Sequence, residues 1–295
     1  MNSTLSTTDV ADVIIEPMTG VMGVRSENHP RLKQRIAENF SRAAHSYDEA
    51  AILQKRVAAR TMLGLPAQLA EVGCQNKTHR VLDLGSGTGL HSLMLADRYA
   101  NAMVTGMDLA MGMLEFARQN ADGYPRVNWC SGDIESIPLQ SGAIDLIYSS
   151  LAIQWCCFEK VLSEVSRVLR PGGSFVFSTL AEGSLKELDA AWCLAGESDR
   201  VNRFNRFEAQ QQSIVQSDFS PRTFSLKAET LYYPDIITLL RGLKALGVNT
   251  VLAGNDGLLT RRKLEVLKQA YESFRQPDGL PLTYQVIYGV LQKPL

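Results

Sequence analysis

A glycine-rich turn behind a short apolar run constrains the fold of this chain more than any other feature. Residues 81–89 read Val-Leu-Asp-Leu-Gly-Ser-Gly-Thr-Gly, and a helix is predicted to begin at about Leu90. Because glycine carries no Cβ, its backbone can approach a bound ligand closely. A second apolar run over residues 102–107 ends at Asp108, whose carboxylate can accept hydrogen bonds from a ribose diol. Together these segments predict a nucleotide site at the ends of two strands.

The spacing of the glycines distinguishes between classes of nucleotide. Dinucleotide-binding folds use G-x-G-x-x-G with a helix N-terminus facing the pyrophosphate, whereas Gly85, Gly87 and Gly89 form G-x-G-x-G. Asp83 lies at the entrance of the turn, where a carboxylate repels a pyrophosphate and attracts an ammonium or sulfonium. The pattern D-x-G-x-G-x-G resembles motif I of class I S-adenosylmethionine-dependent methyltransferases. A structural glycine turn and an NAD-dependent reductase are the less favoured alternatives.

Strands and helices alternate through the centre of the chain. The predicted strands span residues 80–84, 102–107, 127–131, 143–149 and 174–179. The predicted helices between them span residues 90–99, 111–120 and 158–169. This alternation is typical of an α/β fold with a parallel sheet, right-handed crossovers and ligands bound at the carboxyl ends of the strands. Four polar residues fall at those ends: Asp83, Asp108, Asp133 and Ser149.

The flanking segments predict how the chain is divided. We expect a flexible tail (1–30) followed by a single domain (31–295). The domain begins with a helical cap (31–72) and a cofactor-binding core (80–180). It continues with a helical lid or insertion (182–217) and ends with terminal strands that contain a helical insertion (223–295). Within the last segment, strands at 223–233 and 282–291 enclose helices at 236–246 and 260–275. Arg170-Pro-Gly-Gly173 predicts a sharp turn in which a glycine forms the left-handed cap of the preceding helix.

The composition argues against several classes of function. The 295 residues carry 30 Lys and Arg against 31 Asp and Glu, and this formal net charge of -1 gives no strong field for nucleic acid. No apolar run approaches the roughly 18 residues of a membrane span, and no signal peptide is recognised. The five cysteines form no C-x-x-C pair and the four histidines no H-x-x-x-H pair, which indicates reduced thiols and no metal site. We therefore expect a cytoplasmic protein that binds neither nucleic acid nor a membrane.

The resemblance to class I methyltransferases implies roles for the residues around the turn. In that family the glycine turn lies under the methionine part of the cofactor, and the acid at the position of Asp108 holds the ribose. The acid at the position of Asp133 accepts a hydrogen bond from the adenine amino group, although an ordinary turn aspartate is the plainer interpretation. The cofactor-binding residues implied in this way are Asp83, Gly85, Ser86, Gly87, Gly89, Asp108, Leu109, Asp133, Ile134 and Ser149. The fold implied is a Rossmann-like, mostly parallel sheet with an antiparallel last strand.

Two segments carry candidates for the acceptor side of such a site. Gln154 follows the fourth strand and is predicted to face the methyl-transfer centre or, equally, solvent. Trp155 beside it is compatible with either the centre or the core, because aromatic side chains dominate buried area. Arg42 and Tyr47 lie in the helical lead-in, which is either an ordinary amphipathic helix or a lid over the cofactor.

A row of basic residues lies in the segment expected to form the helical lid. Arg200, Arg203 and Arg206 recur every third residue. On a continuous helix this spacing places the side chains along one side. The row is then either a solvated face or a docking patch for an acidic partner.

Several segments together are similar to the malonyl-[acyl-carrier protein] O-methyltransferases of biotin synthesis. They are the motif-I block, Ile36–Tyr47, Ser149–Trp155, Val201–Phe204, Leu243–Asn249 and Gly279–Gly289, within residues 33–293. The lead-in helix and the last two segments are more specific than motif I. Ser86 and Ser150 stand where cysteine and asparagine are frequent in the family, but neither change removes a charge or breaks the turn.

The resemblance implies methyl transfer from S-adenosylmethionine to the free carboxyl of a malonyl thioester, carried by acyl carrier protein or coenzyme A. A malonyl carboxylate is ionised at neutral pH and needs no general base, so the enzyme has to hold and align it, which arginine does well through bidentate hydrogen bonds. The catalytic candidates are Tyr47, Arg42, Arg203 and Gln154. The alternatives are a methyltransferase for another small molecule, such as a quinone precursor, and a non-catalytic cofactor-binding subunit.

Overall fold

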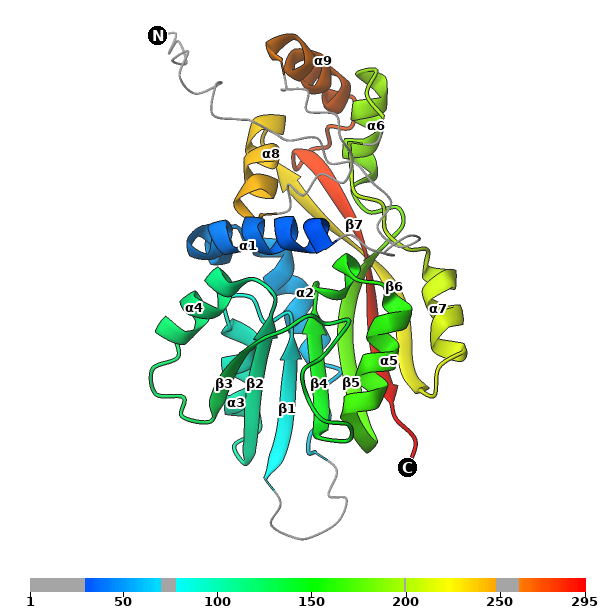
Figure 1. Ribbon diagram of the computed structural model, residues 1–295. Helices are drawn as coiled ribbons and strands as arrows, with labels where there is room; N and C mark the ends of the chain where they lie inside the picture. The colour runs from blue at the N-terminus through cyan, green and yellow to red at the C-terminus, as the bar shows by residue number, and fades with distance from the viewer. Residues whose placement is uncertain (1–29, 70–77, 199, 248–259) are drawn as a thin grey trace.

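A seven-stranded sheet forms the centre of the molecule (Figure 1), with the strand order β3-β2-β1-β4-β5-β7-β6. The computed structural model describes residues 30–69, 78–198, 200–247 and 260–295. The strands are β1 (His79–Leu84), β2 (Ala102–Asp108), β3 (Val127–Ser131), β4 (Ile144–Ser150), β5 (Leu169–Ala181), β6 (Ser220–Tyr233) and β7 (Leu280–Gln292). The first five pair in parallel, whereas β7 is antiparallel to both β5 and β6. This confirms the predicted mostly parallel sheet with an antiparallel last strand.

Helices cover both faces of this sheet. They are α1 (Pro30–Ala50), α2 (Ile52–Met62), α3 (Leu90–Arg98), α4 (Met111–Gln119), the single-turn helix η1 (Ile153–Trp155), α5 (Phe158–Val168), α6 (Lys186–Leu194), α7 (Phe207–Val215), α8 (Ile236–Ala245) and α9 (Arg261–Glu272). Successive side chains of a strand point to opposite faces. In β5, Phe175 and Phe177 therefore pack with α5, while Val176 packs in the cluster that holds Leu95 of α3.

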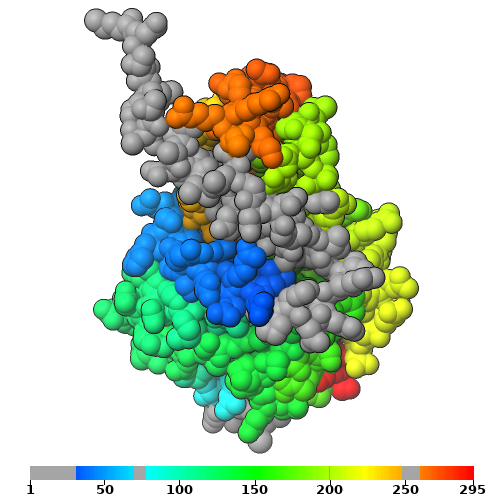
Figure 2. All heavy atoms as spheres, turned by 45° about the horizontal axis from the view of Figure 1, so that its top comes forward, coloured from blue at the N-terminus to red at the C-terminus, as the bar shows by residue number. Residues whose placement is uncertain are grey.

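The helix α1 crosses above the carboxyl ends of the strands (Figure 1) and is the cap of the site. Its Ser41 hydroxyl accepts a hydrogen bond from the Gly112 amide of α4 at 3.1 Å. Near its other end, Asp48 accepts one from the hydroxyl of Thr88 in the glycine turn at 2.8 Å. The space-filling view shows the blue surface of this cap lying against the green surface of the core (Figure 2). The two contacts fix α1 over the turn rather than beside it.

The segment expected to be a helical lid over residues 182–217 is not one helical unit. Gly196, with φ +76°, follows the end of α6, and an irregular segment leads to α7. The predicted arginine row is therefore wrong, because its three members do not share a helix. Arg200 is buried and donates twice to Glu197, at 3.0 and 2.6 Å. Arg206 is exposed and pairs with Glu182 at 3.2 Å.

The predicted turn at residues 170–173 is a bulge inside β5. The helix α5 ends at Val168, and Leu169 already pairs with Ile144 of β4. The next pair on the same ladder joins Ser174 to Leu146, so the extra residues of β5 are extruded from the ladder. The left-handed glycine is Gly172, at φ +76°, which lies in the bulge instead of capping the helix.

The chain ends in a long hairpin between β6 and β7, with α8 and α9 inserted between the two strands as predicted. The expected tail, apart from its last residue, and residues 248–259 of the insertion lie outside the described residues. In the described ranges, no helix combines the length and apolar character that a bilayer crossing requires.

Candidate functional site

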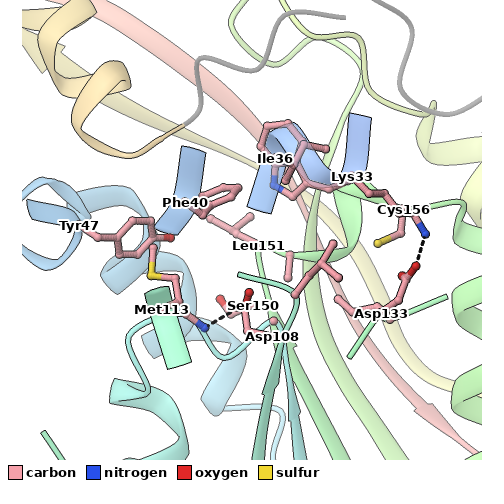
Figure 3. A pocket seen from close by; sticks show the side chains of 16 residues that line it. Lys33, Ile36, Phe40, Tyr47, Asp108, Met113, Asp133, Ser150, Leu151 and Cys156 are labelled. Carbon is pink, nitrogen blue, oxygen red and sulfur yellow. Dashed lines mark hydrogen bonds and ion pairs between the residues drawn. The ribbon is translucent and has the colours of Figure 1, made fainter. Parts of the chain in front are cut away.

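A pocket with about 720 Å³ of empty space, partly open to solvent, lies between the sheet and the cap. Its floor comes from the carboxyl ends of the strands: Gly85 and Gly87 after β1, Asp108 at the end of β2, and Ser150 at the end of β4. The cap supplies the opposite wall. Figure 3 shows Lys33 and Asp133 at one end of this pocket and Tyr47 at the other. Ligands of parallel α/β sheets bind at this edge.

The glycine turn leaves open space above its middle residue. Its start is held by β2, since the carbonyl of Met107 accepts hydrogen bonds from the amides of Gly85 at 2.8 Å and Ser86 at 3.0 Å. Gly87 has φ +53°, and a Cβ built on it meets no atom of the described residues within 4 Å. That position is therefore a cradle in which a ligand can touch the backbone.

Asp108 joins the turn to the second strand. Its carboxylate accepts hydrogen bonds from the Gly87 amide at 2.9 Å and the Ala110 amide at 2.8 Å. Burial raises the pKa of Asp108, and the hydrogen bonds from backbone amides partly offset the effect. A carboxylate has about four lone-pair positions, so the two bonds leave acceptor capacity for a diol in the pocket.

Asp83 lies beneath the turn and does not line the pocket. It is buried and accepts a hydrogen bond from the hydroxyl of Ser92 at 2.6 Å. Burial raises its pKa to about 7; the Ser92 bond lowers the pKa and the charge of Asp108 raises it. Two carboxylates close together in a buried place make the floor of the pocket favourable for a cation.

The opposite end of the pocket is closed by an ion pair between the cap and the loop after β3. The Nζ atom of Lys33 lies 2.6 Å from Asp133 and 2.9 Å from Glu135. Burial lowers the pKa of Lys33, but the hydrogen bonds and charges of the two carboxylates outweigh it, so the pKa lies above its ordinary value. Lys33 therefore stays protonated and ties the start of α1 across the pocket (Figure 3).

We expect Lys33→Met to speed dissociation of a nucleotide ligand about threefold to fivefold, because partly exposed ion pairs contribute up to about 1 kcal/mol. Stopped-flow fluorescence of Trp155, which lines the pocket, measures the rate. The matched control is Lys186→Met, at an exposed position on α6. Equal dissociation rates in the Lys33 variant and the wild type would contradict a closing role for this ion pair.

Tyr47 of the cap reaches the end of the pocket nearest the glycine turn. Burial raises its pKa well above the ordinary value, and the charges of Asp108 and Asp48 add to the effect. The phenol is therefore neutral and able to donate a hydrogen bond. Phe40 packs between Tyr47 and Trp155, with ring centroids 6.3 and 5.8 Å away. These aromatic rings form an apolar wall at this end.

A second cavity, called the inner chamber below, adjoins the pocket through shared wall residues. It has about 500 Å³ of empty space, part of which is open to solvent. Both cavities are lined by Phe40, Tyr47, Leu151 and Trp155. The remaining walls come from α2, α8, β5, β7 and the segment between α6 and α7, and they are mostly aliphatic. Gln154 lines this chamber and not the pocket.

The structure brings together part of the predicted site. Among the cofactor-binding candidates, those that line the pocket are Gly85, Gly87, Asp108, Leu109, Asp133 and Ile134. Those that lie outside its lining are Asp83, Ser86, Gly89 and Ser149; the last is fully buried and donates to the carbonyl of Leu84 at 2.8 Å. Of the two arginine candidates, Arg42 is exposed and contacts Asn39, and Arg203 is exposed. Neither arginine is among the described residues that line the pocket or the inner chamber.

Sequence reasoning missed several lining residues, of which Lys33, Ile36 and Met113 are the clearest. A signal for the first two was present. Lys33, Ile36, Phe40 and Tyr47 are separated by three, four and seven residues. Residues at this spacing lie along one face of a helix. Because Tyr47 was a site candidate, the other three residues on its face could have been predicted to line the pocket. Met113 on α4 offers no such signal.

Known proteins resemble this chain in sequence. Residues 81–173 match a family described as methyltransferase domain. The malonyl-[acyl-carrier protein] O-methyltransferase of Serratia marcescens is 40% identical over 91% of this chain and 99% of that protein. That of Methylovorus sp. (strain MP688) is 38% identical over 89% of each chain. The biotin biosynthesis bifunctional protein BioHC of Cellvibrio japonicus is 40% identical over 89% of this chain, which spans about half the length of that protein.

Solved structures resemble the chain in fold. A chain of the Haloferax volcanii complex between the Trm112 methyltransferase activator and a methyltransferase gives a TM-score of 0.54 at 16% identity, covering 88% of this chain and 98% of that one. The YcgJ protein of Bacillus subtilis gives a TM-score of 0.53 at 18% identity, and the match covers 82% of this chain and 99% of YcgJ. At such low identity the likeness establishes the fold alone.

Proposed function

Because the chain belongs to the malonyl-[acyl-carrier protein] O-methyltransferase family, we propose that it methylates the free carboxyl of a malonyl thioester with S-adenosylmethionine. The thioester is carried by acyl carrier protein or by coenzyme A, and the methyl ester primes pimeloyl synthesis for biotin. One observation of the structure supports this most strongly. The nucleotide-type pocket and a mostly aliphatic inner chamber meet at Tyr47 and Leu151. A donor and an acceptor can therefore meet between them.

The residues of the pocket fit S-adenosylmethionine. The open cradle at Gly87 accepts the methionine part, and Asp108 keeps acceptor capacity for the ribose hydroxyls. Asp133 and Ile134 line the same pocket, and we propose that they contact the adenine. The buried carboxylates Asp83 and Asp108 favour a cationic sulfur over a neutral one. When bound, S-adenosylmethionine supplies a methyl group on a sulfonium, and transfer to a carboxylate oxygen gives a methyl ester.

The protein's own contribution to this reaction is alignment and exclusion of water. A malonyl carboxylate is ionised at neutral pH, so no side chain has to remove a proton. The neutral phenol of Tyr47 donates a hydrogen bond that orients the carboxylate without cancelling its charge. Phe40, Leu151 and Trp155 surround the meeting point with apolar surface. Desolvation strengthens the attraction between the carboxylate and a sulfonium.

We propose Arg203 rather than Arg42 as the arginine that binds the malonyl carboxylate. Both arginines are exposed, but Arg203 adjoins Phe204, which lines the inner chamber, whereas the chain neighbours of Arg42 line neither cavity. Arg203→Gln is expected to raise KM for malonyl-acyl carrier protein at least tenfold, because hydrogen bonds to charged groups contribute about 1.5–3 kcal/mol. Arg42→Gln is the matched control and is expected to change KM less than twofold. Steady-state kinetics with both variants decide between the arginines, and equal effects would contradict this choice.

The proposed function is tested by methyl transfer from labelled S-adenosylmethionine. The acceptors are malonyl-acyl carrier protein and, as the control, acetyl-acyl carrier protein, which has no free carboxyl. Label is expected on the malonyl form alone. If S-adenosylhomocysteine binds but neither form is labelled, the cofactor assignment stands and the acceptor assignment is wrong.

A further inference from the structure

A side chain that lines the inner chamber is fixed in place, and one of its polar atoms has no hydrogen-bond partner in the described part of the chain. Gln154 donates from Nε2 to the carbonyl of Leu151 at 2.6 Å. Exchanging the two ends of the amide would bring two acceptor oxygens together, so this hydrogen bond determines which end is which. The Oε1 atom of Gln154 is consequently directed elsewhere, and it is buried with no hydrogen-bond partner among the described residues.

The backbone that holds Gln154 is itself strained. Leu151 has φ +50°, a left-handed conformation that costs energy for a residue with a Cβ. Its amide donates to the carbonyl of Ser178 at 3.1 Å, which leaves its own carbonyl available to Gln154. Backbone strain of this kind is kept only where the surrounding contacts hold the residue in place, and it is most frequent at functional sites.

A second unpartnered acceptor comes from another helix. Gln54 of α2 also lines the inner chamber, and its Oε1 is buried and accepts no hydrogen bond from any residue that the structure describes. The wall includes Leu53, Leu180 and Leu243, which have no donor, and two phenols, Tyr47 and Tyr284, neither of which donates to this oxygen. An unsatisfied buried acceptor is costly, so two of them around one chamber indicate a ligand that brings donors.

The acceptor group itself cannot be that donor. An ionised malonyl carboxylate and a thioester carbonyl only accept hydrogen bonds, and a carboxylate beside an amide oxygen is repelled. The pantetheine arm that carries the acyl group does have donors, because its first amide N–H lies two carbons beyond the thioester sulfur. The remainder of that part of the arm is aliphatic, which matches the walls of the chamber.

We propose that the inner chamber binds the thioester end of the pantetheine arm and that Gln154 Oε1, assisted by Gln54 Oε1, accepts a hydrogen bond from its first amide N–H. This inference rests on the proposed function, since it presumes a thioester acceptor. It assigns Gln154 to recognition of the carrier arm instead of the carboxylate. The same amide occurs in acyl carrier protein and in coenzyme A, so the contact selects thioesters of either carrier over other malonyl compounds.

The test compares two small substrates that differ only at the amide nitrogen, which carries a hydrogen in one and a methyl group in the other. The first is S-malonyl-N-acetylcysteamine, which contains the amide N–H, and the second is its N-methylated amide analogue. Each is assayed as a substrate and as an inhibitor of malonyl-acyl carrier protein methylation, so that a slow substrate still yields a binding ratio. Wild type is expected to prefer the N–H compound about threefold to tenfold, the range of one buried hydrogen bond.

The variant that isolates the contact is Gln154→Met, which keeps the length of the side chain and removes Oε1. The preference for the N–H compound is expected to fall to nearly one in this variant. Loss of the bond to Leu151 affects both substrates alike and cancels in the ratio. Gln210→Met is the matched control, because Gln210 is also buried with an unpartnered Oε1 but does not line the chamber. It should retain the wild-type preference.

The outcomes separate this inference from the proposed function. If wild type and Gln154→Met show the same preference while malonyl-acyl carrier protein is methylated, the role of Gln154 is wrong and the function stands. If the wild type methylates no malonyl thioester although S-adenosylhomocysteine raises its melting temperature, the proposed function fails and this inference fails with it. If the Gln154→Met variant does not fold, the same preference for the N–H compound is measured in Gln54→Leu. An unchanged preference in Gln54→Leu would then overturn the inference.

Discussion

Asp108→Ala is expected to weaken binding of S-adenosylhomocysteine about 10- to 100-fold. Two backbone amides already hold this carboxylate at the edge of the pocket, which removes the cost of ordering it when a ribose binds. Hydrogen bonds to a charged group contribute about 1.5–3 kcal/mol, and the substitution removes all of those that a diol would make. The variant also frees the Gly87 amide, so the turn loses part of its support.

Calorimetric titration with S-adenosylhomocysteine measures this loss. Asp108→Asn retains the shape of the side chain and one acceptor oxygen, and it is expected to bind with intermediate affinity. Asp122→Ala, at an exposed turn, is the control for a change of net charge. Unchanged affinity in a folded Asp108→Ala variant would exclude the ribose role.

Alanine substitutions at two glycines of the turn are expected to lower different properties. Gly89→Ala should lower stability, whereas Gly87→Ala should lower ligand affinity. A Cβ on Gly87 meets no atom within 4 Å, so Gly87→Ala costs only the left-handed backbone conformation, about 1 kcal/mol. A Cβ on Gly89 lies 2.4 Å from Trp129 Cη2 and 2.8 Å from Ala117 Cβ. Overpacking adds to the same backbone cost, so Gly89→Ala is expected to lose about 2–4 kcal/mol.

Ligand binding is expected to show the reverse order. The Cβ of Gly87→Ala fills the cradle in the pocket, so S-adenosylhomocysteine affinity should fall at least tenfold while the protein stays folded. Urea denaturation and calorimetric titration on both variants give the two quantities. A Gly87→Ala variant that binds like wild type would show that the ligand does not approach the turn closely. A Gly89→Ala variant with wild-type stability would contradict the packing argument.

The strand and helix positions of the core were predictable because their causes are local. Apolar runs and helical periodicity place β3 at its predicted bounds and the other core strands within a residue or two at most ends. The exception at the start of β5 has a tertiary cause. Leu169 joins β4 before the bulge, and only the register between the two strands reveals that the turn residues belong to the strand. The irregular segment between α6 and α7 escaped prediction for a similar reason, since polar helical composition does not show where a helix breaks.

The sequence by itself determined the class of fold and the ligand-binding edge of the sheet. The turn requires three glycines in the left-handed conformation and an acid at the end of the next strand. These residues lie within about twenty-five positions of one another, so a single sequence reveals them. Only the tertiary structure decided which polar groups reach the cavities. It buries Asp83 beneath the turn, brings Lys33 to Asp133 across 100 positions and leaves an oxygen of Gln154 without a hydrogen-bond partner among the described residues. These facts depend on how α1, α2 and the hairpin pack against the sheet, and contacts between segments far apart in the chain leave no periodic signal in a single sequence.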